Sequence, residues 1–348
     1  MNVDPFSLPL SSPLATARET ISERSGFVVR YDHRGETGVG EATPLPGWTE
    51  SVDDCRSGLA DAAAVAVDGG HTDVLLSLDA ASVPAARHGF ATALLDADAR
   101  ADGVPLYQWF DSGRRCDRVP VNATVGDGSP AETADAVEQA VEAGYDCCKL
   151  KVGKRTVDED VARVRAVRER VGDDVTLRAD ANGAWSRDQA ENAFDRFAPL
   201  DVAYIEQPLP ADDLAGHAAL RGTDIGVALD ESLVERRVDS VLDADAADVL
   251  ILKPMVLGGP GNAHTLALRA REQGVEPVVT TTVDAVVARL AALHVAAAIP
   301  DVRACGLATG DRLASDLAPD PTTVTDGTMS VPQATGLGLD PSEVGTDA

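Results

Sequence analysis

DCCKLKVG (residues 146–153) is a short apolar run that ends in charged residues, and runs of the same kind recur along the chain. Between them lie stretches rich in alanine, arginine and glutamate, such as 157–172 and 261–274, whose composition favours helices. Strands that alternate with helices in this way form βα units, whose strands pair in parallel. The later runs are VTLRADANG (175–183), VAYIEQP (202–208), IGVALDES (225–232), ADVLILKP (247–254) and EPVVTTTVD (276–284).

Two further runs complete the series. VPVNATVG (119–126) supplies a first strand, and the segment around CGLATGD (305–311) supplies a last one. Eight βα units at this regular spacing predict an α/β fold, a (β/α)8-type barrel. In such barrels the residues at the carboxyl ends of the strands face one common mouth, where the chemistry takes place.

Three acidic residues lie at or near the ends of consecutive runs, namely Asp180, Glu206 and Asp230. We therefore expect three carboxylates to converge at the mouth of the barrel. Hard oxygen ligands without histidine or cysteine suit Mg²⁺, or Mn²⁺ as the alternative, better than zinc. A helix cap would account for one acidic strand end, but three in phase, flanked by lysines, favour a metal site.

Lysine occurs at only four positions, and three of them lie in KLKVGK (149–154). Lys149 and Lys151 are two apart on a strand, so both side chains point to the same face. Two buried ammonium groups near a divalent cation disfavour each other's charge, so we expect their pKa to fall from ~10.4 towards ~7–8, where lysine becomes a general base. Lys253 enters from the sixth strand on the opposite side of the mouth, whereas Lys154 lies beyond its strand and is expected at the surface. Such a site is suited to removing a proton next to a carboxylate, with a metal ion stabilising the enediolate.

These motifs resemble those of the enolase superfamily, in particular its muconate-lactonizing-enzyme subgroup with a K-x-K base. The resemblance covers most of the chain and rests on GVGEATPLPG (38–47), KLKVG (149–153), RADANGAW (178–185), IEQP (205–208), LDES (229–232), KPMVLGG (253–259) and GLATGD (306–311). The metal ligands that it implies are Asp180, Glu206 and Asp230. Lys151 resembles the base, Lys149 the lysine that tunes it, and Lys253 the lysine on the opposite face. Asn182 and Glu231 sit beside ligands and resemble the residues that support them.

The resemblance also implies the domain organisation. A modified (β/α)7β barrel is expected over residues 116–310, and an α+β capping domain over residues 1–115. The tail, residues 311–348, is expected to return to the capping domain.

Two stretches of the expected capping domain resemble the mobile loops that close over substrate in this superfamily. They are the Pro- and Ser-rich PFSLPLSSPLATARE (5–19) and the turn PLPGWTES (44–51). Without the resemblance they are a Pro-rich loop and a Gly/Trp turn. Trp48 beside two prolines is an unusual choice for a bare surface, so we expect it to face the ligand.

The subgroup includes o-succinylbenzoate synthases, N-succinylamino-acid racemases, muconate cycloisomerases and dipeptide epimerases, which share the lysines and the metal site. Dipeptide epimerases resemble one another in an Asp-x-Asp after the eighth strand that pairs with the substrate's ammonium group, and residues 305–310 contain no such pair. This segment is instead similar to the GLGTG pattern of o-succinylbenzoate synthases, with Ala308 in place of glycine. The resemblance thus implies a Mg²⁺-dependent lyase that dehydrates 2-succinyl-6-hydroxy-2,4-cyclohexadiene-1-carboxylate in menaquinone biosynthesis. The alternative is an isomerase, an N-succinylamino-acid racemase or cycloisomerase, that uses the same two lysines.

One stretch departs from the pattern of the subgroup. Many relatives have serines followed by glutamate and serine at the seventh strand, whereas this chain has TTTVDA (280–285). Asp284 is a methylene shorter than glutamate, and the hydroxyls of Thr280 and Thr281 would replace the serines. We expect Thr281 and Asp284 to lie near the substrate.

Composition limits the partners of the chain. A formal net charge of -27, from 57 acidic and 30 basic residues, argues against binding to nucleic acid or to anionic membranes. The acidic, lysine-poor composition is similar to that of haloarchaeal cytoplasmic proteins, and five cysteines without a C-x-x-C indicate reduced thiols. No signal peptide or apolar stretch of ~18 residues occurs. We therefore expect a cytoplasmic enzyme that acts on a small-molecule carboxylate, with homo-oligomer formation left open.

Overall fold

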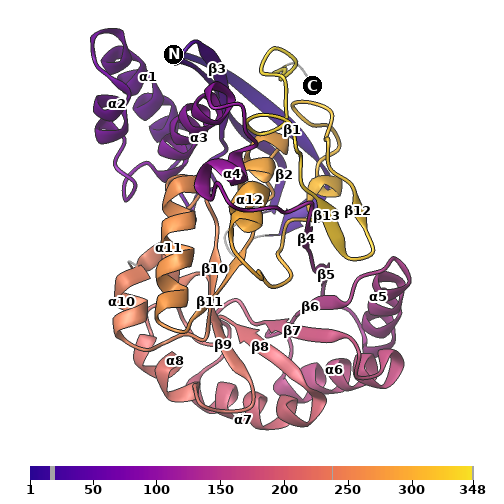
Figure 1. Cartoon of the computed structure of the whole chain (residues 1–348). Coiled ribbons are helices and arrows are strands. Elements are labelled where there is room, and N and C mark those ends of the chain that lie inside the picture. Colours follow the sequence, from indigo (N-terminus) through magenta and orange to yellow (C-terminus); the bar gives the residue numbers. More distant parts are fainter. Residues whose placement is uncertain (16–19, 237, 347–348) are drawn as a thin grey trace.

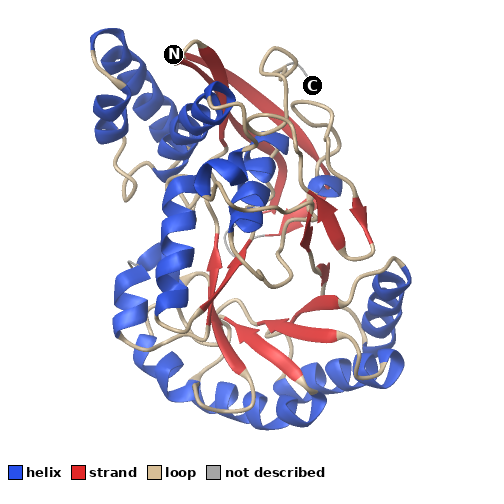
Figure 2. Ribbon diagram, in the orientation of Figure 1, coloured by secondary structure: helices blue, strands red, loops and turns tan. Residues whose placement is uncertain are grey.

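A curled, seven-stranded parallel sheet forms one half of the molecule (Figures 1 and 2). The structure is a computed structural model that describes residues 1–15, 20–236 and 238–346. The strand order β11-β10-β9-β8-β7-β6-β5 follows the chain around the curl, so the predicted α/β barrel is confirmed. The strands are β5 (Ala123–Val125), β6 (Cys147–Lys151), β7 (Thr176–Asp180), β8 (Val202–Glu206), β9 (Gly226–Leu229), β10 (Val249–Leu252) and β11 (Glu276–Val279).

The two edges of this sheet are joined by short bridges. Thr280 bridges to Gly306, and Val121 bridges to Cys305. Residues 305–306 therefore take the place of an eighth strand, as the sequence predicts for the segment around CGLATGD.

The first predicted strand, residues 119–126, is divided between two sheets. β5 belongs to the barrel, but β4 (Arg118–Pro120) pairs with β13 (Thr328–Ser330) in an antiparallel sheet that also contains β12 (Val324–Thr325). Pro120 ends β4, where its missing N–H removes a ladder donor and so separates the two strands.

Helices cover the outside of the curled sheet and connect its strands (Figure 2). Three of them begin with capping boxes, at Ser129, Thr156 and Ser186, which satisfy free N–H groups of the first turn. The barrel helices are α5 (Pro130–Glu142), α6 (Val157–Val171), α7 (Arg187–Phe197), α8 (Leu214–Leu220), α9 (Ser232–Glu235), α10 (Val238–Asp243), α11 (Pro260–Glu272) and α12 (Val286–Ala298), with the 3-10 turns η1 (Ala198–Leu200) and η2 (Gly310–Arg312). None of the helices in the described ranges is long and apolar enough to cross a membrane.

A second region lies beyond the mouth of the barrel (Figure 1). Its antiparallel sheet has the order β1-β2-β3, with β1 (Asn2–Ala15), β2 (Thr20–His33) and β3 (Glu36–Ala42). Its helices are α1 (Val52–Asp68), α2 (His71–Ser77), α3 (Pro84–Ala101) and α4 (Leu106–Phe110). Every residue of α12 is buried, because this apolar helix packs between the barrel and the second region.

Most of the Pro-rich stretch 5–19, expected as a mobile loop, is strand. β1 lies at the edge of its sheet and forms its ladder with β2, while its other side meets the C-terminal tail at an isolated bridge between Leu10 and Leu313. Prolines such as Pro5 and Pro9 are tolerated there because the outer side of an edge strand does not need a full set of donors. The expectation of a loop is therefore wrong up to Ala15, and residues 16–19 lie outside the described ranges.

The C-terminal tail returns to the N-terminal region. Ala314 N donates to Pro9 O at 2.9 Å, Leu106 N donates to Gly336 O at 2.8 Å, and Leu337 N donates to the buried carboxylate of Asp96 at 2.7 Å. These contacts agree in direction with the expected capping domain, while its limits near residues 115 and 311 stay predictions.

Candidate metal and catalytic site

Three buried carboxylates lie at the carboxyl ends of adjacent strands. Asp180 and Glu206 are the last residues of β7 and β8 and are register partners, and Asp230 directly follows β9. Their exposed fractions are 1%, 1% and 5%. The convergence expected from the sequence is thus present in the structure.

Lysine ammonium groups bond these carboxylates from both sides. Lys149, on β6, lies 3.0 Å from Asp180 Oδ2 and donates to both oxygens of Glu206 at 3.1 Å. Lys151 donates to Asp180 Oδ2 at 2.6 Å. Lys253, which follows β10, donates to both oxygens of Asp230 at 2.7 and 2.6 Å. Lys151 ends β6 and Lys253 follows β10, and in the strand order these two strands flank the strands of the three carboxylates.

Burial and neighbouring charge set the pKa values here. Burial, and then the charge of Asp180, raise the pKa of Glu206 to about 7. Burial raises the pKa of Asp230 to about 6, although Lys253 opposes this shift. For Asp180 the two neighbouring lysines, Lys149 first, outweigh burial and lower the pKa.

The expected fall in the pKa of Lys149 is wrong in this structure. Burial does act to lower it, but the charges of Asp180 and Glu206 outweigh burial and raise the pKa of Lys149 well above its ordinary value. The fall was expected from a neighbouring ammonium group and a divalent cation. In the structure the nearest partners of Lys149 are instead carboxylates.

The donor set fits a hard divalent cation in chemistry. Within the described ranges, no three His, Cys, Asp or Glu side chains stand in a ready coordinating arrangement. The oxygens of Glu206 and Asp230 accept hydrogen bonds from Lys149 and Lys253. Yet burial holds the pKa of both Glu206 and Asp230 above the usual range, so the lysines leave these anions undercompensated. A divalent cation is the kind of charge that three buried carboxylates lack, and Mg²⁺ or Mn²⁺ suits their oxygens.

Asn182 and Glu231 link the two ends of the carboxylate series. Asn182 Oδ1 accepts from Lys151 at 2.9 Å, and its Nδ2 donates to Glu231 Oε1 at 2.9 Å. The other oxygen of Glu231 is buried without a hydrogen-bond partner. Both residues therefore adjoin the site, as the sequence predicts.

Trp48 lies over Lys253. The Lys253 ammonium nitrogen is 3.4 Å from the centroid of the Trp48 ring, a cation–π geometry. Trp48 sits in the tight turn after β3, where its N–H donates to Leu45 O at 2.9 Å. The ring thus reaches the barrel mouth from the second region.

The two residues expected at the seventh strand differ in their surroundings. Thr281 is 8% exposed, and its hydroxyl is 3.1 Å from that of Thr309, which follows the eighth-strand segment. Asp284 is 2% exposed, accepts from Thr282, and lies 3.8 Å from Arg24 of β2. Sequence reasoning missed Arg24, and the signal that could have found it is an arginine that stands just before the apolar part of the run SERSGFVV.

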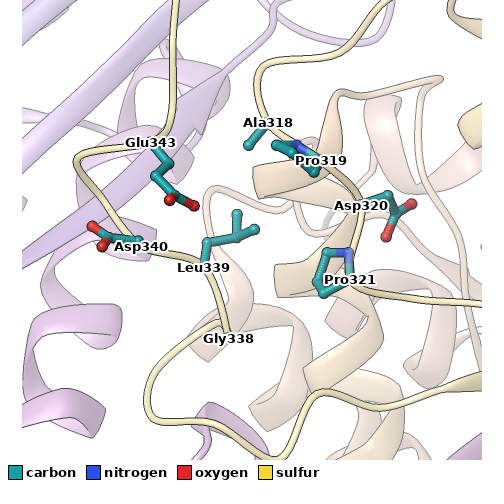
Figure 3. A pocket seen from close by; sticks show the side chains of 8 residues that line it. All are labelled: Ala318, Pro319, Asp320, Pro321, Gly338, Leu339, Asp340 and Glu343. Carbon is teal, nitrogen blue, oxygen red and sulfur yellow. The ribbon is translucent and has the colours of Figure 1, made fainter.

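A separate cavity of about 210 Å³ lies in the C-terminal tail (Figure 3). It shares no residue with the lysine and carboxylate cluster, so it is not part of this site. The lining residues are Ala318, Pro319, Asp320, Pro321, Gly338, Leu339, Asp340 and Glu343.

Comparisons with known proteins show which families and structures the chain is similar to. Two family models match the chain, one described as "Enolase C-terminal domain-like" over residues 132–344 and one as "MenC, N-terminal domain" over residues 2–97. The chain is 32% identical over 347 residues to the L-Ala-D/L-Glu epimerase of Bacillus subtilis, covering 96% of this chain and 94% of that protein. It is 32% identical over 303 residues to the o-succinylbenzoate synthase of Thermosynechococcus vestitus, covering 83% and 86%. The crystal structure of N-succinyl Arg/Lys racemase from Bacillus cereus is similar with a TM-score of 0.87 and 27% identity, over 99% of this chain and 96% of that one.

Proposed function

The chain belongs to the enolase superfamily, and from that premise we propose that it is an o-succinylbenzoate synthase. The reaction would be the Mg²⁺-dependent loss of water from 2-succinyl-6-hydroxy-2,4-cyclohexadiene-1-carboxylate. The observation that carries the proposal is that Lys151 and Lys253 bond the two outer members of a buried carboxylate series, Asp180 and Asp230. A substrate carboxylate at that series would have an amine on either side of it.

In the proposed mechanism the chain's own residues move one proton and stabilise one charge. Asp180, Glu206 and Asp230 would hold Mg²⁺, and its positive charge would favour binding of the substrate carboxylate and make the adjacent C–H bond more acidic. Lys151 takes that proton. The resulting ammonium returns it to the departing hydroxyl, which leaves as water, so Lys151 ends the cycle as it began. Lys253 stays protonated beside Asp230 and stabilises the transient negative charge.

The end of the eighth-strand segment favours this substrate over a dipeptide. Cys305 and Leu307 are both fully buried, and residues 305–309 contain no carboxylate. A dipeptide epimerase would need an acidic pair there to bind the substrate ammonium group. The absence of that pair from residues 305–309 supports the synthase over the epimerase activity of the Bacillus subtilis relative.

The second candidate is an N-succinylamino-acid racemase. Such an enzyme needs one base on each face of the substrate, and Lys151 and Lys253 approach from strands on opposite sides of the carboxylates. The similarity to the racemase structure supports the same idea. Deuterium wash-in at Cα of N-succinyl amino acids would identify this activity.

The experiment that tests the proposal is a dehydration assay with the cyclohexadiene carboxylate, with Mg²⁺ and with EDTA. We expect turnover that requires Mg²⁺ or Mn²⁺. Isotope exchange into N-succinyl amino acids without dehydration would favour the racemase. Dehydration that is unchanged in EDTA would contradict the metal assignment.

We further propose that the protein is a cytoplasmic, salt-adapted enzyme of menaquinone biosynthesis. Its acidic composition and its resemblance to the synthases support this setting.

A further inference from the structure

A buried ionic cluster joins β2 and β3 to the turn between β11 and α12. Its members are Arg24 on β2, Glu41 on β3 and Asp284 in the turn, with exposed fractions of 3%, 0% and 2%. The candidate mechanism uses none of these three residues. Buried charges are costly unless they are paired, so the cluster calls for an explanation.

Arg24 connects three separate segments of the chain. Its guanidinium donates to Thr43 O at 2.9 Å, to Pro44 O at 3.1 Å and to Val283 O at 3.2 Å. It also lies 3.8 Å from Asp284 Oδ1. A planar group with five donors is suited to such a junction, because one side chain fixes several carbonyls at once.

Glu41 connects the same ionic cluster to α12. Its two oxygens accept from the backbone N–H groups of Ala285 at 2.9 Å and Ala288 at 2.8 Å. α12 has no side-chain cap of its own, so a carboxylate from β3 satisfies the first turn of a barrel helix. The second region and the barrel are therefore connected by charge as well as by apolar packing.

Both segments held by Arg24 lead directly to the barrel mouth. Thr43 and Pro44 begin the turn that carries Trp48, whose ring lies 3.4 Å from the Lys253 nitrogen. Val283 closely follows Thr281, and its φ of 61° is unusual for a β-branched residue. A backbone conformation of this kind persists only where its surroundings hold it, and Arg24 bonds its carbonyl.

We propose that Arg24 is a positioning residue that holds the Trp48 turn against the β11–α12 turn and thereby keeps Trp48 over Lys253. The expected effect of Arg24 on catalysis rests on the proposed function, whereas its effect on the position of Trp48 does not. Arg24 touches neither the lysines nor the carboxylates of the site, and it acts through the carbonyls of Pro44 and Val283.

The test compares Arg24→Met and Arg24→Lys with a matched control, Arg168→Met. Arg168 is likewise buried, with 9% of its surface exposed. Its hydrogen bonds to described residues go to backbone carbonyls near the amino ends of β7 and β8, the opposite ends of these strands from the mouth. Those carbonyls belong to Gly172, Val175, Leu200 and Asp201. The control therefore loses a comparable buried arginine without disturbing the mouth.

The first readout needs no substrate. The fluorescence of Trp48 is obtained by subtracting the emission spectrum of each variant that also carries Trp48→Phe from the spectrum of that variant with Trp48 intact. The variant Lys253→Met provides the reference spectrum of Trp48 without a cation over its ring. We expect Arg24→Met to move the Trp48 signal towards that of Lys253→Met, Arg24→Lys to move it part of the way, and Arg168→Met to leave it unchanged. An unchanged Trp48 signal in a folded Arg24→Met protein would overturn the inference. If Arg24→Met does not fold, Arg24→Lys decides in the same way.

The second readout is the kinetics of whichever reaction the wild type catalyses. We expect Arg24→Met to lower kcat about 10- to 100-fold, as displaced catalytic groups do, with partial rescue in Arg24→Lys. Arg168→Met should keep kcat within about twofold even if it melts earlier. Equal loss of stability with equal kcat in the two arginine variants would mean that Arg24 is merely structural. A wild type without synthase activity would contradict the proposed function but leave the emission test intact.

Discussion

Lys151 and Lys253 bond different carboxylates, so each can be removed without abolishing the other's contacts. We expect Lys151→Ala and Lys253→Ala to lower turnover by ~10²–10⁴-fold or more, since each group acts directly on the reacting carbon or its charge. Both variants should still fold and bind Mg²⁺, because the three carboxylates remain. Steady-state kinetics, circular dichroism and Mg²⁺ titration calorimetry together measure these outcomes.

Lys154→Ala is the matched control for the lysine variants. Lys154 is exposed and lies beyond the end of β6, so its removal should leave kcat and KM unchanged. Wild-type turnover in Lys151→Ala or Lys253→Ala would contradict the assignment of these lysines. If Lys154→Ala also lost activity, the losses would reflect the removal of any positive charge rather than the removal of a group in the site.

The residues of the site could be predicted from the sequence where charged side chains recur at or near the ends of successive apolar runs. Asp180, Glu206 and Lys253 each end a run, and the βα pattern brings such ends together. The pKa of Lys149 was not predictable, because its sign depends on distances to carboxylates that only the structure gives. Arg24 was missed because its partners, Thr43 and Val283, lie far from it in the sequence and are backbone carbonyls.

His294 provides a test of pH dependence away from the site. It is fully buried on α12, and burial lowers its pKa to about 4. Above pH ~6.5 the ring is neutral in both folded and unfolded chains, but between ~6.5 and about 4 only the unfolded chain takes up the proton. Because of His294, the free energy of unfolding should therefore fall by about 3 kcal/mol as the pH falls through that window.

His294→Gln removes the titration while keeping a donor for Leu337 O, which lies 3.3 Å from Nε2. Urea unfolding between pH 7 and 4 is expected to show a smaller loss of stability in the variant than in the wild type. Parallel curves for the two proteins would mean that His294 is not held neutral.

At the scale of elements, the packing of β3 on α3 depends on two glycines. A Cβ on Gly40 would lie 1.9 Å from Gly89 O, and one on Gly38 would lie 1.9 Å from Ala93 O. Gly40→Ala must therefore push α3 from the sheet, and we expect a cost of about 3 kcal/mol in the free energy of unfolding. Denaturant unfolding followed by circular dichroism measures it.

Gly113→Ala is the control for that substitution. Gly113 is exposed, and an added Cβ would meet only Asp111 Oδ1 at 3.6 Å, so the expected change is within about 0.5 kcal/mol. If Gly40→Ala were as mild as Gly113→Ala, the close contact between β3 and α3 would be disproved.

Strands β3 and β1 differ in how well the local sequence predicts their structure. GVGEA places glycines at alternate positions, on one face of a strand, and such spacing indicates close approach of another backbone. β1 was harder, because its prolines indicate a loop unless the strand is known to be an edge. Edge position is a property of the assembled sheet, so local sequence does not contain it.

At the scale of the whole molecule, the buried ionic cluster of Arg24, Glu41 and Asp284 forms a junction between the barrel and the second region. This junction is buried away from solvent, whereas the chain as a whole carries 57 acidic and 30 basic residues, a net charge of -27. Added salt should therefore act on the surface and leave the junction largely unaffected.

Thermal unfolding in KCl tests this view of the surface. A net charge of -27 repels itself in the compact state, and the screening length falls from ~10 Å at 0.1 M salt to ~3 Å at 1 M. We expect the unfolding midpoint to rise by roughly 5 °C between 0.05 and 1 M KCl, because a few kcal/mol of relieved repulsion shifts the Tm of a 348-residue chain by roughly 1–2 °C per kcal/mol. Sorbitol at equal osmolality controls for solvent exclusion and should give a smaller rise. A midpoint that is insensitive to KCl would mean that the acidic surface is already compensated within the fold.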